Sequence, residues 1–222
     1  MRRVSFEAFH GAFGLVYLML VTNLLLAVAA APLLVLAVTT DPARSWPLLA
    51  VAAAAAAPGG AAAFRAFADH SQGGTGPARA FARGYLDCWR HALAIGALTA
   101  MVLAVLLVDV RALGASTAGV LVIPLLAVLC PLALGLGVVS LVVVAEAPQA
   151  RLRDVLRASA YLAVRRWYLT AVSLVAGGVQ VALFTQAPAL ALGLTAAPVL
   201  YVAWANSRYT LRPVLAVADL TE

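Results

Sequence analysis

Charged residues are what this sequence has least of. Aspartate, glutamate, lysine and arginine make up 11% of the 222 residues, whereas hydrophobic residues make up 64%. Soluble domains carry about 25% charged and about 45–50% apolar residues. A water-soluble fold with so little polar sequence could not cover its apolar surface. The composition therefore indicates an integral membrane protein. Its long uninterrupted apolar runs favour α-helices over a transmembrane barrel, whose strands alternate apolar and polar residues.

Residues that carry out chemistry are also scarce. There are two cysteines, Cys88 and Cys130, and three histidines, His10, His70 and His91. No pair stands at the spacing of a zinc site, and no P-loop, HExxH or G-x-S-x-G motif is present. The sequence therefore predicts no enzyme activity, no metal and no cofactor.

Lysine is absent, and all fifteen basic residues are arginine. The net charge of +6 could indicate a nucleic-acid partner. The arginines flank apolar runs, however, and membrane topology explains that placement directly. We therefore expect no nucleic-acid partner.

Six apolar runs approach the length of about 20 residues that crosses a bilayer. We predict a single membrane domain over residues 1–222, an all-α polytopic bundle of about six transmembrane helices. The predicted spans are residues 12–38, 46–64, 92–108, 118–145, 168–187 and 189–205. The last two are separated only around Pro188, which predicts a tight antiparallel hairpin. The first run could instead be a signal peptide, because the small residues at 27–31 offer a cleavage site.

The fourth run is unusually long, because residues 112–145 carry no charge over 34 positions. As one helix it would measure about 50 Å, which is long for one crossing but too short for two crossings and a turn. Pro124 and Pro131 are expected to end or kink this helix. We therefore predict an irregular entry followed by one span.

The arginines are unequally divided between the two sides that six spans create. One side holds thirteen of them: Arg2, Arg3, Arg65, Arg79, Arg83, Arg90, Arg151, Arg153, Arg157, Arg165, Arg166, Arg208 and Arg212. The other side holds only Arg44 and Arg111. Because arginine-rich loops stay in the cytoplasm, both termini are predicted to be cytoplasmic.

Two arginine-rich segments, residues 78–91 and 151–167, carry a pattern that topology alone does not require. In each, apolar residues share one helical face and arginines lie away from it. The apolar face of the first segment is formed by Phe81, Tyr85, Cys88 and Trp89. Both are predicted to be amphipathic helices at the cytoplasmic membrane surface, each running into a span. Their candidate contacts with a partner or with lipid are Arg79, Arg83, Trp89, Arg90, Arg153, Arg157, Arg165 and Trp167.

Polar residues deep in the predicted spans are few, and none is charged. An amide in hydrocarbon must find a hydrogen-bond partner, so Asn23 and Gln180 are the candidate intramembrane polar contacts. A transporter coupled to protons or sodium usually needs an intramembrane carboxylate or a broken-helix ion site. The carboxylate is missing, whereas "PGG" at 58–60 and the prolines of the fourth run leave a broken helix open.

The order of these features resembles the YesL-like family of bacterial integral membrane proteins, a domain of unknown function. The resemblance covers roughly residues 12–213. It is carried by "NLL" at 23–25 followed by Pro32, "PGGAAAF" at 58–64, "FARGYLDCWRHAL" at 81–93, "VDVRAL" at 108–113 and the second arginine-rich segment. The resemblance implies a bundle of five or six helices in the bacterial plasma membrane. It also implies an association with carbohydrate uptake, often beside sugar ABC transporters. It supplies no catalytic residues.

Two functions are therefore expected. The first is a non-enzymatic accessory protein of a membrane transport system for carbohydrate uptake. Its partners would be the lipid bilayer and an ABC-type sugar permease. The second is a small-solute permease or the substrate-binding membrane component of an importer. That function predicts a cavity lined by Thr22, Asn23, Gln180 or Tyr201. The arginine-rich segments could also contact anionic lipid alone.

Overall fold

The computed structural model describes residues 2–114, 116, 119–149, 152–165, 167–186 and 190–218. Side chains are described at 13–41, 43–114, 116, 119–149, 152–157, 159, 168, 171–186, 190–191 and 194–209. All regular elements in these ranges are helices, which confirms the predicted all-α class. They are α1 (Arg2–Ala29), α2 (Ala31–Thr39), α3 (Pro42–Ser71), α4 (Pro77–Leu113), α5 (Gly119–Glu146), α6 (Leu152–Arg165), α7 (Trp167–Gln186), the π-helix η1 (Ala191–Thr195) and α9 (Ala196–Ala218).

Several of these helices are long and apolar enough to cross a membrane. Within the described residues they are α3, α4 and α5, and the bent pair α1–α2 makes a fourth if its two halves form one crossing. Residues 171–186 of α7 form a shorter apolar helix. This arrangement is that of a multi-pass membrane protein, as the composition indicates.

The first predicted span is broken rather than straight. α1 and α2 meet at Ala30 and are bent by 67° relative to each other. Pro32 sits in the first turn of α2. There its missing N–H is harmless, whereas inside a continuous helix its ring would clash with the preceding turn. The run predicted over residues 12–38 is thus divided between two helices, and the proline explains the break.

Prolines elsewhere do not end the helices that contain them. α5 runs from Gly119 through Pro124 and Pro131 to Glu146, so the predicted irregular entry is replaced by helix. α3 likewise continues through Pro58. Neighbouring helices in a membrane bundle can compensate for the hydrogen bond that each proline removes. At Gly59 a side chain would come within 2.8 Å of the Ala29 Cβ, so the glycine lets α1 approach α3.

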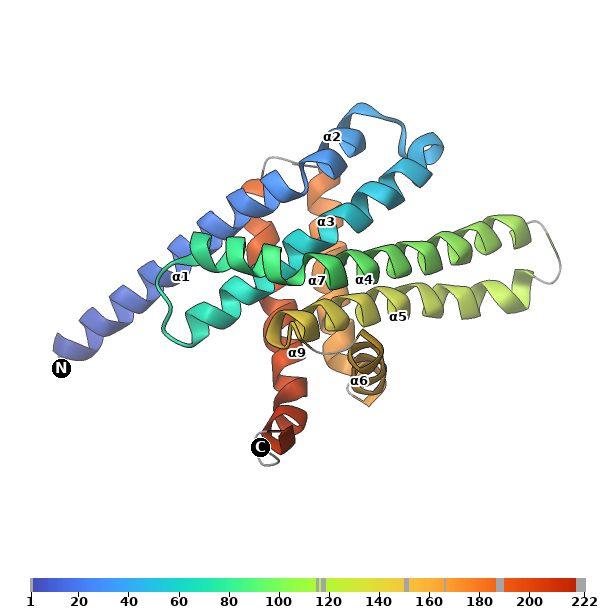
Figure 1. Ribbon diagram of the computed structural model, residues 1–222. Helices are drawn as coiled ribbons and strands as arrows, with labels where there is room; N and C mark the ends of the chain where they lie inside the picture. The colour runs from blue at the N-terminus through green and yellow to red at the C-terminus, as the bar shows by residue number, and fades with distance from the viewer. Residues whose placement is uncertain are drawn as a thin grey trace.

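The core is built around the second half of α3. Residues 61–64 and 66–68 are almost completely inaccessible, and Phe64 and Phe67 are the largest of them. α1, α4, α5 and α9 all pack against α3. In Figure 1, the first half of α3 lies between α2 and α4, and its second half crosses α4. The run of alanines allows this crowding, because small residues let helix backbones approach closely in membrane bundles.

α4 and α5 form a long hairpin beside α3 (Figure 1). α4 is one continuous helix of 37 residues, about 55 Å long at 1.5 Å per residue. It therefore joins the predicted segment 78–91 and the predicted span 92–108 in a single element, longer than the roughly 30 Å hydrocarbon core.

The C-terminal helices close the bundle. α7 and α9 pack against each other, and α6 contacts both α5 and α7. The predicted sixth span, 189–205, falls within η1 and α9, and its helix continues to Ala218. The predicted turn at Pro188 lies outside the described residues.

Candidate functional site

The candidate residues of the first arginine-rich segment lie on the first half of α4. Arg79, Arg83 and Arg90 are all exposed, and Trp89 is 45% accessible. The Arg90 guanidinium lies 5.5 Å from the centre of the Trp89 ring, within the range of a cation–π contact. Leu86, one turn before Arg90, is 71% exposed. This part of α4 thus presents charged and large apolar side chains together.

The apolar face of this segment differs from the prediction. Phe81 and Cys88 are buried in the protein, whereas Tyr85 and Trp89 are exposed. The buried stripe of α4 is formed by Pro77, Ala80, Phe81, Gly84, Cys88, Ala92 and Ile95. Because α4 packs against both α3 and α5, the segment is part of the bundle. Part of its predicted apolar face, Phe81 and Cys88, therefore packs against protein.

The second arginine-rich segment forms α6. Arg153 and Arg157 are exposed there, while the side chains of Arg165 and Trp167 lie outside the described residues. Val155 is buried and shares one hydrophobic cluster with Cys88 of α4 and Val144 of α5. The two arginine-rich segments are therefore linked through their apolar faces, which pack into the same cluster.

The C-terminal end of α5 is capped by side chains from α3 and α4. Arg65 of α3 donates from Nη1 to the carbonyl oxygen of Ala145 at 3.0 Å. The Cys88 thiol lies 3.6 Å from the carbonyl oxygen of Val144 and donates to it. The last carbonyls of a helix have no partner in their own helix, and they carry partial negative charge that favours a cation. Arg65 was not among the predicted site residues, because its helix-capping role depends on a contact 80 positions away.

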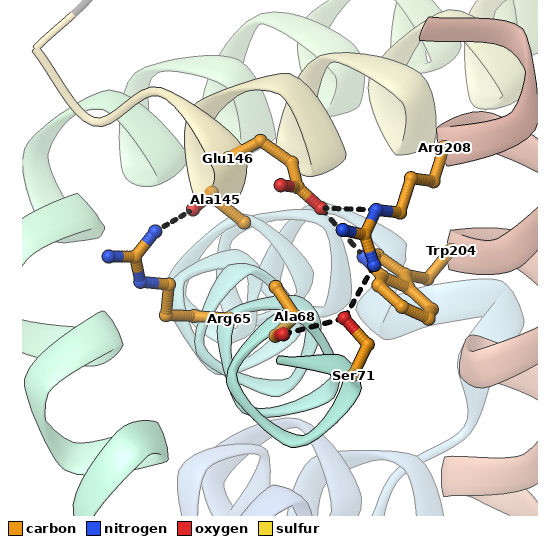
Figure 2. A network of polar contacts seen from close by, with 7 residues as sticks. All are labelled: Arg65, Ala68, Ser71, Ala145, Glu146, Trp204 and Arg208. Carbon is orange, nitrogen blue, oxygen red and sulfur yellow. Dashed lines mark hydrogen bonds and ion pairs between the residues drawn. The ribbon is translucent and has the colours of Figure 1, made fainter. Parts of the chain in front are cut away.

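A network of polar contacts joins α3, α5 and α9 beside this cap. Figure 2 shows Glu146 at its centre, facing Trp204 and Arg208. Trp204 donates from Nε1 to Glu146 Oε1 at 3.1 Å, and Arg208 Nε lies 3.9 Å from the same oxygen. Arg208 also donates to the hydroxyl of Ser71 and lies 5.1 Å from the centre of the Trp204 ring. The network fixes the ends of α3 and α5 to α9.

A polar cleft of about 320 Å³ opens where α3 ends and α4 begins. Its lining is formed by Arg65, Asp69, Thr75, Gly76, Arg79, Ala80, Arg83 and Asp87. Arg65 reaches this position because residue 84 is glycine: a Cβ there would lie 2.7 Å from the Arg65 Cβ. The structure thus brings Arg79 and Arg83, both predicted site residues, next to Arg65 and two carboxylates. It does not place Trp89 or Arg90 in this lining.

The two predicted intramembrane amides both contact the segment around η1. Asn23 Oδ1 accepts a hydrogen bond from the backbone N–H of Ala197 at 2.6 Å. Gln180 donates from Nε2 to the carbonyl oxygen of Ala191 at 2.6 Å, and its Oε1 accepts from the Thr195 hydroxyl at 2.7 Å. A π-helical turn departs from regular α-helical hydrogen bonding, so its backbone groups are available to side chains. Both amides thus stabilise contacts between helices.

The side chains predicted to line a solute cavity are in contact with other parts of the protein. Tyr201 packs edge-on against Phe67, with ring centres 5.3 Å apart, and also against Trp204. Thr22 is fully buried, and its hydroxyl has no hydrogen-bond partner in the described part of the chain. These contacts leave Asn23, Gln180 and Tyr201 engaged within the bundle.

Among the described residues, no group of three or more histidine, cysteine, aspartate or glutamate side chains could hold a metal ion. Comparison of the chain with protein-family profiles, curated proteins and solved structures gave no match. Function is therefore inferred from the residues and contacts described above.

Proposed function

We propose that this chain is a six-span protein of the bacterial plasma membrane with both termini in the cytoplasm. Its crossings would be α1–α2, α3, α4, α5, α7 and η1–α9, with α6 on the cytoplasmic side. The arginine distribution supports this topology, because α6 and the ends of α3 and α4 beside their connecting turn carry arginines, whereas the opposite ends of α3 and α4 carry only Arg44 and Arg111.

We further propose that the protein acts by binding another membrane protein, as a non-enzymatic accessory subunit. The observation that supports this role is the α4 strip, defined here as Tyr85, Leu86, Trp89 and Arg90. These large side chains are exposed on the charged half of α4, outside its uncharged stretch. Exposed tryptophan, tyrosine and arginine side chains are the types that contribute most to protein–protein binding energy.

The resemblance to the YesL-like family favours a carbohydrate-uptake system as the setting. The partner would then be an ABC-type sugar permease that approaches the α4 strip at the cytoplasmic membrane boundary. The solute-permease alternative is less favoured, because Asn23 and Gln180 already bond within the bundle.

Site-specific photocrosslinking in native membranes tests this proposal. A photoreactive residue at Leu86 should crosslink to a permease subunit of an uptake system, and Arg90→Gln should reduce that yield severalfold. A matched control places the same residue at Leu121, which is 83% exposed in the first turn of α5, at the other end of the hairpin. Crosslinks to lipid alone, or equal protein crosslinks from both positions, would contradict a docking role for the α4 strip.

A further inference from the structure

The cleft between α3 and α4 holds charges of both signs that are not neutralised by one another. Three arginines (Arg65, Arg79 and Arg83) and two aspartates (Asp69 and Asp87) line it. Within the described residues, neither of the ion pairs closer than 4.0 Å joins any of these five. In the part of the chain that the structure describes, the only hydrogen bond from their guanidinium groups is the one from Arg65 to Ala145. Each arginine presents five N–H donors, so most of the donors of Arg65, Arg79 and Arg83 have no hydrogen-bond partner among the described residues.

Opposite charges are arranged in sequence along the cleft. Arg79, Arg83 and Asp87 follow one another at intervals of four residues on α4, so they share one side of the helix. Each interval corresponds to about 6 Å along the axis. On α3, Asp69 likewise follows Arg65 by four residues. The cleft therefore offers a guanidinium and a carboxylate about one helical turn apart on both of its walls.

The cleft also lies at the expected depth for lipid headgroups. Arg65 directly follows the uncharged run that ends at Phe64. Arg83 stands level with Arg65, because a Cβ at the adjoining Gly84 would lie 2.7 Å from the Arg65 Cβ, and Arg79 lies about 6 Å further along α4. The polar headgroup regions add roughly 5–8 Å on each side of the hydrocarbon core. If α3 and α4 cross the membrane, the boundary of the hydrocarbon passes beside this cleft.

We propose that the α3–α4 cleft binds the headgroup of phosphatidylethanolamine from the cytoplasmic leaflet. The phosphate accepts hydrogen bonds from Arg79 and Arg83, as guanidinium groups readily bind phosphate oxygens. The primary ammonium, two carbons from the phosphate ester, donates to Asp87 or Asp69. One headgroup thereby pairs with both signs of charge in the cleft.

Other lipid headgroups fit this lining less well. An anionic lipid without an amine would leave two carboxylates unpaired beside its phosphate, and like charges repel. A choline headgroup carries a cation, but its trimethylated nitrogen has no N–H with which to donate to a carboxylate. The lining thus selects a phosphate next to a protonated primary amine.

Native mass spectrometry of the purified full chain in detergent tests the proposal directly. Lipids with matched acyl chains are compared: phosphatidylethanolamine, its mono-, di- and trimethylated forms, and phosphatidylglycerol. Retention should fall stepwise with methylation, with at least a tenfold lower apparent affinity for the trimethylated lipid. Water-soluble glycerophosphoethanolamine forms a further arm, and binding as tight as that of the lipid would overturn the assignment of a membrane lipid.

Paired variants separate the two halves of the headgroup. Asp69→Asn with Asp87→Asn should abolish the discrimination among methylated forms while retaining phosphatidylglycerol. Arg79→Gln with Arg83→Gln should weaken all the phospholipids about tenfold. Arg153→Gln with Arg157→Gln, on α6, removes the same charge outside the cleft and should leave the selectivity unchanged.

Equal retention of every lipid by the unmodified chain, or the same loss from the α6 pair, would overturn the proposal. It depends on α3 and α4 crossing the membrane but not on the transport partner, so it and the crosslinking experiment at Leu86 can fail separately.

Discussion

α3 and α4 are neighbouring antiparallel helices, yet they occupy opposite environments. The segment of α3 over residues 61–68 is enclosed by α1, α4, α5 and α9. The most apolar stretch of α4 has almost no fully buried residues, although it is the more hydrophobic of the two. In a membrane, apolar side chains need not be hidden from lipid, whereas closely packed interfaces favour small residues. Alanine content therefore marks the centre of this bundle better than hydrophobicity does.

The largest loss of stability should come from removing a large side chain in the enclosed part of α3. Phe67 is completely buried and lies against Phe64, Tyr201 and Trp204. Phe67→Ala should lower the free energy of unfolding by about 3 kcal/mol, because large-to-small changes in a packed core leave a cavity. Thermal unfolding in detergent can be followed with a thiol-reactive dye that labels buried Cys88 once the bundle opens.

A smaller loss of stability is expected when a side chain is added at the contact between α3 and α4. Gly84→Val places a side chain against Arg65 and within 3.4 Å of the Ala62 backbone before any adjustment. Overpacking of this kind costs about 2 kcal/mol. The same dye measurement should show the loss, and an unchanged melting temperature would mean that the two helices are not in close contact at this point.

The hydrogen bonds of the predicted intramembrane amides should affect the free energy of unfolding less than the change at Gly84 does. Asn23→Leu removes the acceptor for the Ala197 N–H and should cost about 1 kcal/mol, the size of an interhelical hydrogen bond in a membrane. Thr185→Val is a suitable control, because the Thr185 hydroxyl donates to Ala182 of its own helix. If both variants unfold alike, the bond between α1 and α9 carries no stability of its own.

The exposed stretch of α4 should be the least sensitive. Met101 is 60% exposed there. Met101→Ala should change the free energy of unfolding by less than about 0.5 kcal/mol, as is usual for surface positions. A loss close to that of Phe67→Ala would show that this face is covered by protein, and the contrast between the two helices would no longer hold.

Sequence patterns predicted the helical class, the long apolar helices and the exposed arginines on α4, because these depend on composition and local periodicity. They did not predict the break at Ala30 or the continuity of α5 through Pro124 and Pro131. A proline either breaks a helix or is accommodated within it. The outcome depends on whether neighbouring helices compensate for the hydrogen bond that the proline removes. The roles of Arg65 and Glu146 were missed for a related reason. Each contacts residues more than fifty positions away, and only the packing of α3, α5 and α9 brings them together.

The orientation of the arginine-rich end is the claim on which both proposals depend, and cysteine accessibility measures it most directly. In a variant with Cys88→Ala and Cys130→Ala, single cysteines replace Thr75 in the α3–α4 turn or Ser116 between α4 and α5. Both positions are exposed. A membrane-impermeant maleimide applied to intact cells should label the cysteine at 116, and the cysteine at 75 only after the membrane is permeabilised. Labelling of position 75 in intact cells would contradict the topology and place the cleft and the α4 strip outside the cytoplasm.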